Sequence, residues 1–321
     1  MGTEKKCLLV FDGNALVHRA YHALPPLSTK NGELVNAVYG FFLVFFKAIQ
    51  EFCPEYVTVS FDIKGPTFRH KQFAAYKAKR PATPEELSRQ LPIVKRILSA
   101  FNIAIYEKKG FEADDIIGTI SRLAPKKQTK KQTASAADLE TVIISGDLDV
   151  LQLVDKQTKA LIFRKGVKET VLYDENSVSI KYQGLRPKQL IDFKALRGDP
   201  SDNIPGVTGI GEKTAIELVK EFGSLENIYN ILESDKEILT EIKPKIKEML
   251  SQQKEQAFLS KALAAINQKV PIDFNLEKCR WNSYNKEEAA RILAEFEFYS
   301  LIKKLPELGK QKEKKGNLRL L

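Results

Sequence analysis

The sequence contains few of the residues that form disulfides or bind soft metals. Only three of its 321 residues are cysteine and three are histidine. The cysteines are far apart and odd in number. This excludes a disulfide framework and a structural zinc site, and it favours reduced, buried thiols in a cytoplasmic protein. His18 and His22 lie close together, but carboxylates elsewhere in the chain make a better site for a hard cation.

Long apolar segments are also absent. No apolar run is long enough to cross a membrane, and the N-terminus has no signal-peptide pattern, so we expect no membrane partner. With 43% apolar residues, the chain can bury a substantial core as one large domain or two small ones. The net charge is +10, from 51 Lys and Arg against 41 Asp and Glu. This balance fits a polyanionic partner but does not identify one by itself.

The most informative residues are acidic ones at the carboxyl ends of predicted strands. Segments 7–12, 57–62 and 141–147 are short, β-rich and end in an aspartate. In an open parallel sheet these strand ends share one edge, where ligands bind. Two denser acidic clusters follow, one at a predicted helix start (112–115) and one in a predicted loop (199–202). Together with Asp149 they bring the carboxylates at this edge to nine: Asp12, Asp62, Glu112, Asp114, Asp115, Asp147, Asp149, Asp199 and Asp202.

So many carboxylates in one place require cations, because they cannot all stay ionised together. Oxygen-only clusters of this kind suit Mg²⁺ or Mn²⁺. Taken alone, Asp12 or Asp62 would be an ordinary turn aspartate, and cluster 112–115 an ordinary acidic helix start. The coincidence of all these features favours a metal site over the simpler alternatives. A glycine-containing turn can bring Asp147 and Asp149 to one cation.

The order of apolar patterns predicts an α/β fold. Over the first half, strands alternate with helices such as the one expected over 36–52, where apolar residues recur at helical spacing. This alternation implies a mostly parallel central sheet with helices on both faces. After residue 173 the pattern changes to helices separated by Gly and Pro. We therefore expect an α/β core over 1–173, a helical region over 174–305 and a frayed tail over 306–321.

Two basic segments are candidates for contact with nucleic acid. Residues 125–138 are polar and basic and predict a mobile surface loop, with DNA contact as the less favoured alternative. Cations alternate with aromatics over 68–80, which fits phosphate contact combined with base stacking; a solvated basic helix is the alternative. Given the acidic site, we expect Lys77 and Arg80 to steady a scissile phosphate and Tyr76 to stack on a base.

Residues 206–215 predict a tight turn that leads into a helix. The N–H groups at such a helix start can bind a phosphate, and Lys213 and Lys220 add positive charge. The small residues of the turn match a helix-hairpin-helix element, which grips a DNA backbone without reading bases. An ordinary helix-turn-helix hairpin is the alternative.

These motifs resemble, in order and content, those of one nuclease family. The matching segments are 10–14, 37–41, 61–62, 68–69, 76–80, 110–115, 146–149, 196–199 and 211–215. On these residues the chain is similar to the 5′→3′ exonuclease (flap endonuclease) domain at the N-terminus of bacterial DNA polymerase I, over about residues 5 to 305. The resemblance implies a PIN/flap-nuclease-like fold. It also implies structure-specific hydrolysis of DNA or RNA-primer phosphodiesters by two metals, in primer removal and DNA repair.

The resemblance also implies roles for individual residues. One divalent ion, Mg²⁺ or Mn²⁺, would be held by Asp12, Asp62, Glu112 and Asp114. A second would be held by Asp147, Asp149 and Asp202, while Asp115 and Asp199 would act through water. Residues 68–91 would form a helical arch that admits a single-stranded 5′ end, and the hairpin at 206–215 would bind K⁺ through backbone carbonyls. The residues expected to contact DNA are Arg69, Lys71, Gly206, Gly209, Gly211, Lys213 and Thr214.

The expected partners are DNA with a 5′ single-stranded flap or nick and an RNA primer–DNA junction. We expect a monomer. We also expect a covalent or functional link to a DNA polymerase, because the chain ends about where polymerase-bearing relatives continue. The sequence leaves open whether the chain is a stand-alone protein or a fragment. A toxin-type RNase is disfavoured, since such domains are shorter and lack the hairpin. A non-catalytic DNA-junction binding protein is the alternative function, against which the intact acidic set argues.

Overall fold

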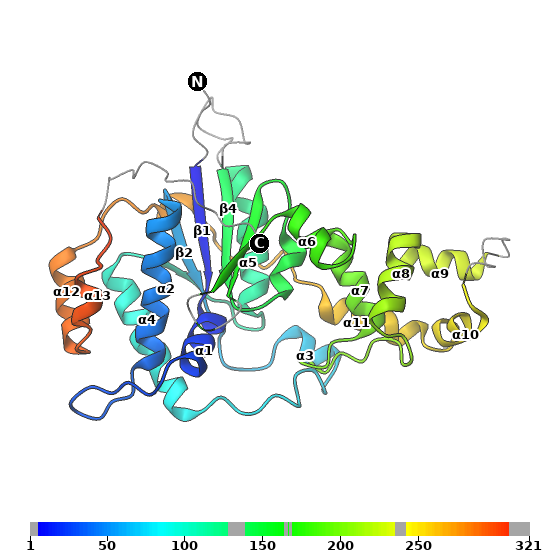
Figure 1. Ribbon diagram of the computed structural model, residues 1–321, viewed down its shortest axis with the longest axis horizontal. Helices are drawn as coiled ribbons and strands as arrows, with labels where there is room; N and C mark the ends of the chain where they lie inside the picture. The colour runs from blue at the N-terminus through cyan, green and yellow to red at the C-terminus, as the bar shows by residue number, and fades with distance from the viewer. Residues whose placement is uncertain (1–5, 128–138, 164–165, 167–168, 235–241, 308–321) are drawn as a thin grey trace, which may run out of the picture.

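A six-stranded sheet forms the centre of the protein (Figure 1). The computed structural model describes residues 6–127, 139–163, 166, 169–234 and 242–307. The strand order is β3-β2-β1-β4-β5-β6; β1 to β5 are parallel and β6 is antiparallel to β5. This confirms the predicted, mostly parallel sheet. The strands are β1 (Lys6–Asp12), β2 (Tyr56–Ser60), β3 (Ala104–Tyr106), β4 (Leu139–Ser145), β5 (Thr158–Phe163) and β6 (Thr170–Tyr173).

Helices cover both faces of the sheet, as predicted. Side chains alternate along β1, so Leu8 packs with α5 (Ala113–Lys127) on one face and Leu9 packs with α2 (Asn36–Phe52) on the other. Figure 1 shows α2 and α4 (Glu85–Ala100) on one side of the sheet and α5 on the other. Because both faces are buried, the strands are apolar along most of their length.

Helix α2 occupies the residues predicted for it. Its start has no capping side chain of its own, but the buried Gln90 of α4 accepts the N–H groups of Ala37 (2.8 Å) and Val38 (3.2 Å). These bonds satisfy two donors that have no partner inside the helix. The helix ends at Cys53, which adopts a left-handed conformation (φ 44°). One polar side chain of α4 therefore fixes the start of α2.

The residues after β6 fold as helices, as predicted. Helix α7 (Leu190–Arg197) packs on α11 (Lys254–Ala264), and Figure 1 shows this part extending away from the sheet. Helix α12 (Lys286–Glu295) returns to pack on α4. The other helices and turns are α1 (Gly13–Ala23), α3 (Phe68–Gln72), η3 (Asp149–Leu153), α6 (Glu175–Lys181), η4 (Pro187–Gln189), α8 (Glu212–Phe222), α9 (Leu225–Glu233), α10 (Pro244–Gln252), η6 (Leu276–Cys279) and α13 (Tyr299–Ile302).

Some expectations are corrected or lie outside the described residues. Helix α5 continues to Lys127, so the first residues of the loop predicted over 125–138 are helical instead. Residues 128–138 and 308–321, which hold the rest of that loop and most of the predicted tail, lie outside the described residues. The three cysteines, all among the described residues, are not joined by a disulfide, as expected, but only Cys279 is buried; Cys7 is partly buried and Cys53 is exposed. Among the described helices, none has the length and hydropathy of a membrane span.

Candidate functional site

Two aspartates lie at the carboxyl ends of β1 and β2 and bond to neighbouring elements of the fold. Asp12, the last residue of β1, caps α1 by accepting the N–H of Ala15 (3.0 Å). Its other oxygen accepts a hydrogen bond from the hydroxyl of Ser145, at the end of β4 (2.8 Å). Asp62, just beyond β2, accepts the N–H of Ala113 at the start of α5 (2.7 Å). The predicted convergence of strand-end aspartates on one edge is therefore present.

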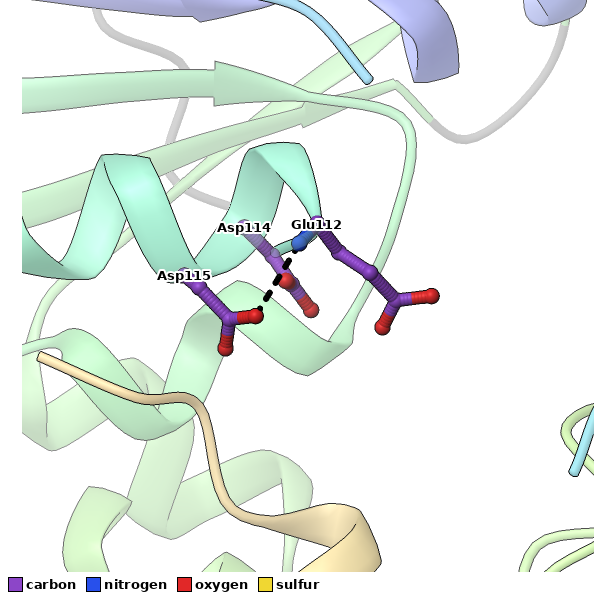
Figure 2. Close-up of side chains that lie close together, drawn as sticks. All are labelled: Glu112, Asp114 and Asp115. Atoms are coloured by element: carbon purple, nitrogen blue, oxygen red, sulfur yellow. Dashed lines mark hydrogen bonds between the residues drawn. The ribbon is translucent and has the colours of Figure 1, made fainter. Parts of the chain in front are cut away.

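The start of α5 adds three more carboxylates beside this edge. Glu112, Asp114 and Asp115 each offer an oxygen, and these oxygens lie within 4.8 Å of one another (Figure 2). Glu112 and Asp115 are buried, and the N–H of Glu112 donates to Asp115 (3.1 Å). An acidic helix start is common, but three buried or partly buried carboxylates in such proximity need positive charge nearby.

Asp114 has an oxygen without a protein partner. Its Oδ1 is buried and makes no hydrogen bond among the described residues. Burial raises the pKa of this carboxyl well above its usual range; the charge of Arg69 lowers it but does not offset burial, and the nearby Asp115 and Glu112 raise it further. A buried, unpartnered polar atom costs about 1–3 kcal/mol, and a bound cation would remove that cost. The oxygen-only surroundings therefore fit a hard divalent ion such as Mg²⁺ or Mn²⁺.

Electrostatics on the β1 and β4 side lead to the same conclusion. Burial raises the pKa of Asp12 to about 7, and the charges of Asp62 and Asp147 add to this shift. Burial and the neighbouring Asp147 raise the pKa of Asp149 to about 7 as well. Asp147 itself is exposed, and its carboxylate accepts the N–H of Asp149 (2.9 Å). Near neutral pH, this side of the cluster cannot be fully ionised without an added cation.

Two cations from the predicted basic segment reach the carboxylates. The Lys77 ammonium donates to Glu112 (2.5 Å) and lies 3.7 Å from Asp202. Arg80 donates to the carboxylate of Asp202 and to the carbonyl of Ser201 (3.3 Å). Lys77 has a left-handed backbone (φ 56°), and its N–H donates to the carbonyl of Asp202 (2.8 Å). Both cations are thus fixed against the acidic site, where we predicted them to act.

Lys194 was not predicted from the sequence. Its ammonium donates to Asp149 and to Asp199 (2.6 Å), and the lysine side chain is 16% exposed. Although burial opposes ionisation, the ion pair with Lys194 lowers the pKa of Asp199 to about 2. Lys194 lies on α7, about one turn before the acidic loop that contains Asp199. Its closeness in sequence to the acidic loop is the only feature that could have suggested a role for Lys194. Nothing in the sequence shows that α7 faces Asp149.

Tyr76 lies in a different environment from the one predicted. It is only 3% exposed, and its hydroxyl lies 3.0 Å from Glu112 and 3.2 Å from Asp202. A buried ring cannot stack on a base, so this placement corrects the prediction. A tyrosine hydroxyl has a single hydrogen, which it donates within the carboxylate pair. Tyr76 therefore belongs to the framework that supports the acidic site.

Arg69 is also buried rather than free to meet DNA. It is 1% exposed and pairs with Glu112 and Asp115, both at 2.8 Å. A side chain so enclosed cannot reach a phosphate, so the predicted DNA contact is corrected. Lys71, two residues later on α3, is exposed and remains available to a partner. This segment therefore contains both buried and exposed cations, which its sequence pattern does not distinguish.

The hairpin predicted over 206–215 leads into α8, as expected. Gly206 is buried with a left-handed backbone (φ +65°), and an added Cβ would lie 2.2 Å from the nitrogen of Gly198. Its N–H donates to Ser260 (3.0 Å), so the prediction that Gly206 contacts DNA is corrected. Gly209 and Gly211 are exposed. At the start of α8, Lys213 is exposed and Thr214 is partly exposed.

Comparison with known proteins gives consistent matches over most of the chain. A family model described as "5'-3' exonuclease, N-terminal resolvase-like domain" matches residues 7–183. A second, described as "5'-3' exonuclease, C-terminal SAM fold", matches residues 185–287. DNA polymerase I of Bacillus subtilis (strain 168) is 41% identical over 98% of this chain and 34% of its own length. DNA polymerase I of Caldicellulosiruptor bescii is 44% identical over 93% of this chain and 33% of its own length.

Solved structures share the fold at lower sequence identity. T5 5′-exonuclease with bound zinc has a TM-score of 0.63 at 20% identity, covering 93% of this chain and 96% of that one. Flap endonuclease-1 from Methanococcus jannaschii has a TM-score of 0.55 at 19% identity, covering 94% and 90%. The catalytic core of Rad2 in complex with DNA substrate has a TM-score of 0.58 at 18% identity, covering 92% and 89%. These structures support the predicted PIN/flap-nuclease-like fold.

Proposed function

Because the chain belongs to the 5′-3′ exonuclease family, we propose that it hydrolyses DNA phosphodiesters at 5′ ends, as a 5′→3′ exonuclease and 5′-flap endonuclease. The observation that supports this function most strongly is the acidic edge of the sheet, where the buried Asp114 Oδ1 has no protein partner among the described residues. A carboxylate cluster of this kind has no purpose in a protein that only binds a polyanion, since it would repel the ligand. It is well suited to a hydrolase that holds cations between itself and a phosphate.

The acidic residues divide into two metal-binding sets. We assign the first Mg²⁺ or Mn²⁺ to Asp12, Asp62, Glu112 and Asp114. We assign the second to Asp147, Asp149 and Asp202. When bound, such ions supply an activated water and Lewis-acid stabilisation of the phosphoryl oxygens. Asp199, held by Lys194, acts through water, and Asp115 supports its neighbours from behind the site.

Lys77 and Arg80 supply positive charge from the protein itself. Both contact carboxylates of the site, so both lie beside the place where a scissile phosphate would bind. Preorganised cations stabilise the negative charge that develops on the phosphate during hydrolysis. Tyr76 supports Glu112 and Asp202, because its hydroxyl lies within hydrogen-bond distance of both and donates its one hydrogen to one of them at a time.

The DNA itself would contact two exposed parts of the chain. Residues 68–91, which we propose to form the arch, carry the exposed Lys71 and would receive the single-stranded 5′ end. The hairpin would hold the duplex backbone through Gly209, Gly211, Lys213 and Thr214, with K⁺ bound by backbone carbonyls. Contacts of this type predict salt-sensitive binding without sequence preference. Two structures similar in fold, T5 flap endonuclease with DNA and metal ions and the Rad2 core with DNA substrate, contain bound DNA, which supports DNA as the partner.

The chain spans about one third of the length of the curated relatives it matches. We propose that its wider role is the removal of RNA primers at primer–DNA junctions and the repair of nicked DNA, linked to a DNA polymerase. We propose a cytoplasmic monomer with an α/β core over 1–173 and a helical region over 174–305. The basic segment 128–138, for which DNA contact was the less favoured prediction, lies outside the described residues.

A single assay tests the proposed activity. The full chain is incubated with a 5′-labelled flap duplex, or with single-stranded RNA, in Mg²⁺ or in chelator. We expect cleavage of the flap near its junction only with Mg²⁺, and little cleavage of the RNA. Flap binding without cleavage in either condition would instead establish a DNA-junction binding protein. Preferential cleavage of the RNA would indicate a ribonuclease.

A further inference from the structure

We propose, on the basis of the function proposed above, that Arg69 is a positioning residue that holds Glu112 in the metal site. It also ties that carboxylate to the end of α11. One face of its guanidinium meets the acidic cluster: Nη1 donates to Glu112 (2.8 Å) and Asp115 (2.9 Å), and Nη2 donates to Asp115 (2.8 Å). The pair with Asp115 is bidentate, which fixes the orientation of both groups.

The opposite edge of the same guanidinium meets the end of α11. Nε donates to the carbonyl of Leu263 (2.9 Å), and Nη2 donates to the carbonyl of Ala265 (2.8 Å). Carbonyls at a helix end have no partner within the helix, so Arg69 satisfies two that would otherwise be buried alone. A guanidinium has five N–H donors, and these five bonds use all of them. Arg69 is thus held in one conformation between two parts of the chain.

Asp115 is bonded to Arg69, to Glu112 and to the segment that follows α11. One of its oxygens accepts from Arg69 and from the N–H of Asn267 (2.8 Å), and the other accepts from Arg69 and from the N–H of Glu112 (3.1 Å). A carboxylate has about four acceptor positions, so none is left for a metal. We therefore propose that Asp115, counted among the acidic metal-site residues and expected to act through water, instead supports Glu112 and Arg69. Glu112 is instead held at its backbone by Asp115 and at its side chain by Arg69.

The consequence is that removing Arg69 should weaken metal binding without removing any ligand. Glu112 would keep its contacts with Lys77 and the Tyr76 hydroxyl but lose the bond that fixes the orientation of its Oε2, and Asp115 would become an unpaired buried charge. Loss of partners that orient metal ligands typically lowers metal affinity about 10–100-fold. A role in folding alone would lower stability and leave the affinity of the folded protein unchanged. The two possibilities therefore differ in a quantity that can be measured in the absence of DNA.

Gln152 provides a matched control. It is buried and fastens the same segment, donating to the carbonyl of Ala264 (3.1 Å) and accepting the N–H of Ile266 (3.0 Å). It makes no described bond to any residue of either metal set. A Gln152→Leu variant therefore loses the attachment of the α11 end while leaving Arg69 and Glu112 in contact.

The test compares Mn²⁺ affinity, by electron paramagnetic resonance, and thermal stability of the metal-free full chain. Arg69→Lys keeps the positive charge but loses the planar arrangement of N–H donors, and we expect its Mn²⁺ affinity to fall about tenfold. The Mn²⁺ affinity of Gln152→Leu should stay within about twofold of wild type. Both variants should melt at lower temperature. Unchanged Mn²⁺ affinity in Arg69→Lys, or an equal fall in Gln152→Leu, would overturn the proposal.

A rescue experiment separates charge balance from positioning. In Arg69→Gln, adding Asp115→Asn removes the stranded buried charge, so we expect melting temperature to recover while Mn²⁺ affinity stays low. Recovery of both would show that Arg69 acts only through its charge. If wild type neither binds Mn²⁺ nor cuts the flap, the proposed function itself fails. If it does both and the Arg69 variants match it, only the positioning role fails.

Discussion

Glu112 and Asp12 are buried carboxylates at the same edge of the sheet, but their charges are balanced in different ways. Glu112 contacts Lys77 and Arg69, and although burial opposes ionisation, these two cations lower its pKa. Asp12 accepts hydrogen bonds from Ala15 and Ser145, and within the described parts of the chain no Lys or Arg lies at salt-bridge distance from it. Burial therefore raises the pKa of Asp12 to about 7.

The same division separates other members of the cluster. Asp199, paired with Lys194, has a pKa of about 2, whereas the pKa of Asp114, without a hydrogen bond to its Oδ1, is raised. Asp149 is intermediate, because Lys194 on one side does not offset burial and the charge of Asp147 on the other. The protein thus supplies its own cations to some carboxylates and leaves the rest for ions from solution. The uncompensated carboxylates mark the centre of the proposed metal sites, whose ligand sets also include the cation-paired Glu112 and Asp202.

The largest effect should come from removing an uncompensated ligand. Asp114→Asn keeps the shape of the side chain but removes the charge that a metal would contact. We expect cleavage of flap DNA to fall about 10³-fold or more, since metal-ligand charge contributes several kcal/mol to the transition state. Binding of flap DNA, measured by fluorescence anisotropy, should survive. Near-normal cleavage by this variant would exclude Asp114 as a ligand.

Neutralising a cation-paired carboxylate and neutralising an uncompensated one should change the free energy of unfolding in opposite directions. Glu112→Gln leaves Arg69 and Lys77 partly unpaired, so we expect the metal-free protein to lose about 3 kcal/mol of unfolding free energy. Asp114→Asn removes an uncompensated buried acid and should raise that free energy by about 1 kcal/mol at pH 7. Denaturant unfolding of both variants without metal provides the comparison. Shifts of the same sign would contradict the division.

The uncompensated carboxylates should also make stability depend on pH. Asp12 and Asp149 have folded-state pKa values of about 7, above the value of 3.8 for an unperturbed aspartate. The folded state therefore binds more protons than the unfolded state between these values, and stability falls as pH rises from about 4 to 7. Each group contributes a few kcal/mol at most. We expect melting temperature of the metal-free chain to fall over this window, and Mg²⁺ to reduce the fall. A rising melting temperature would contradict the assignment.

The smallest effect tests the protein's own cations as competitors of the metal. Lys77 occupies Glu112 in the metal-free chain, so Lys77→Met should raise Mn²⁺ affinity by about threefold, equivalent to less than 1 kcal/mol. Lys79→Met, at an exposed neighbouring position, serves as control and should leave the affinity unchanged. Calorimetric titration without DNA measures both. Weaker Mn²⁺ binding in Lys77→Met would show that Lys77 supports the metal site instead of competing with it.

Local patterns were sufficient to predict much of the fold and the acidic edge. The boundaries of α2 follow from its apolar spacing, and the convergence of Asp12, Asp62 and Asp147 follows from the parallel sheet. Both inferences depend on residues close in sequence or on a general property of sheets. They needed no knowledge of which side chains meet across the fold.

Roles that depend on distant contacts could not be predicted. Arg69 and Tyr76 stand among exposed cations in the sequence, and only the fold shows that both are buried. The partners of Arg69 lie between 43 and 196 residues away, and Lys194 meets Asp149 across 45 residues. An exposed cation is free to contact a phosphate, whereas a buried one such as Arg69 pairs with carboxylates of the protein. Composition and spacing are the same in both cases.

The most direct measurement is the number of divalent ions that the metal-free full chain binds, determined by Mn²⁺ titration with electron paramagnetic resonance. We expect two ions per chain, with Asp12→Asn weakening one site and Asp149→Asn weakening the other. A chain that binds no Mn²⁺, or whose binding is unchanged by both substitutions, would contradict the assignment of the uncompensated carboxylates to metal.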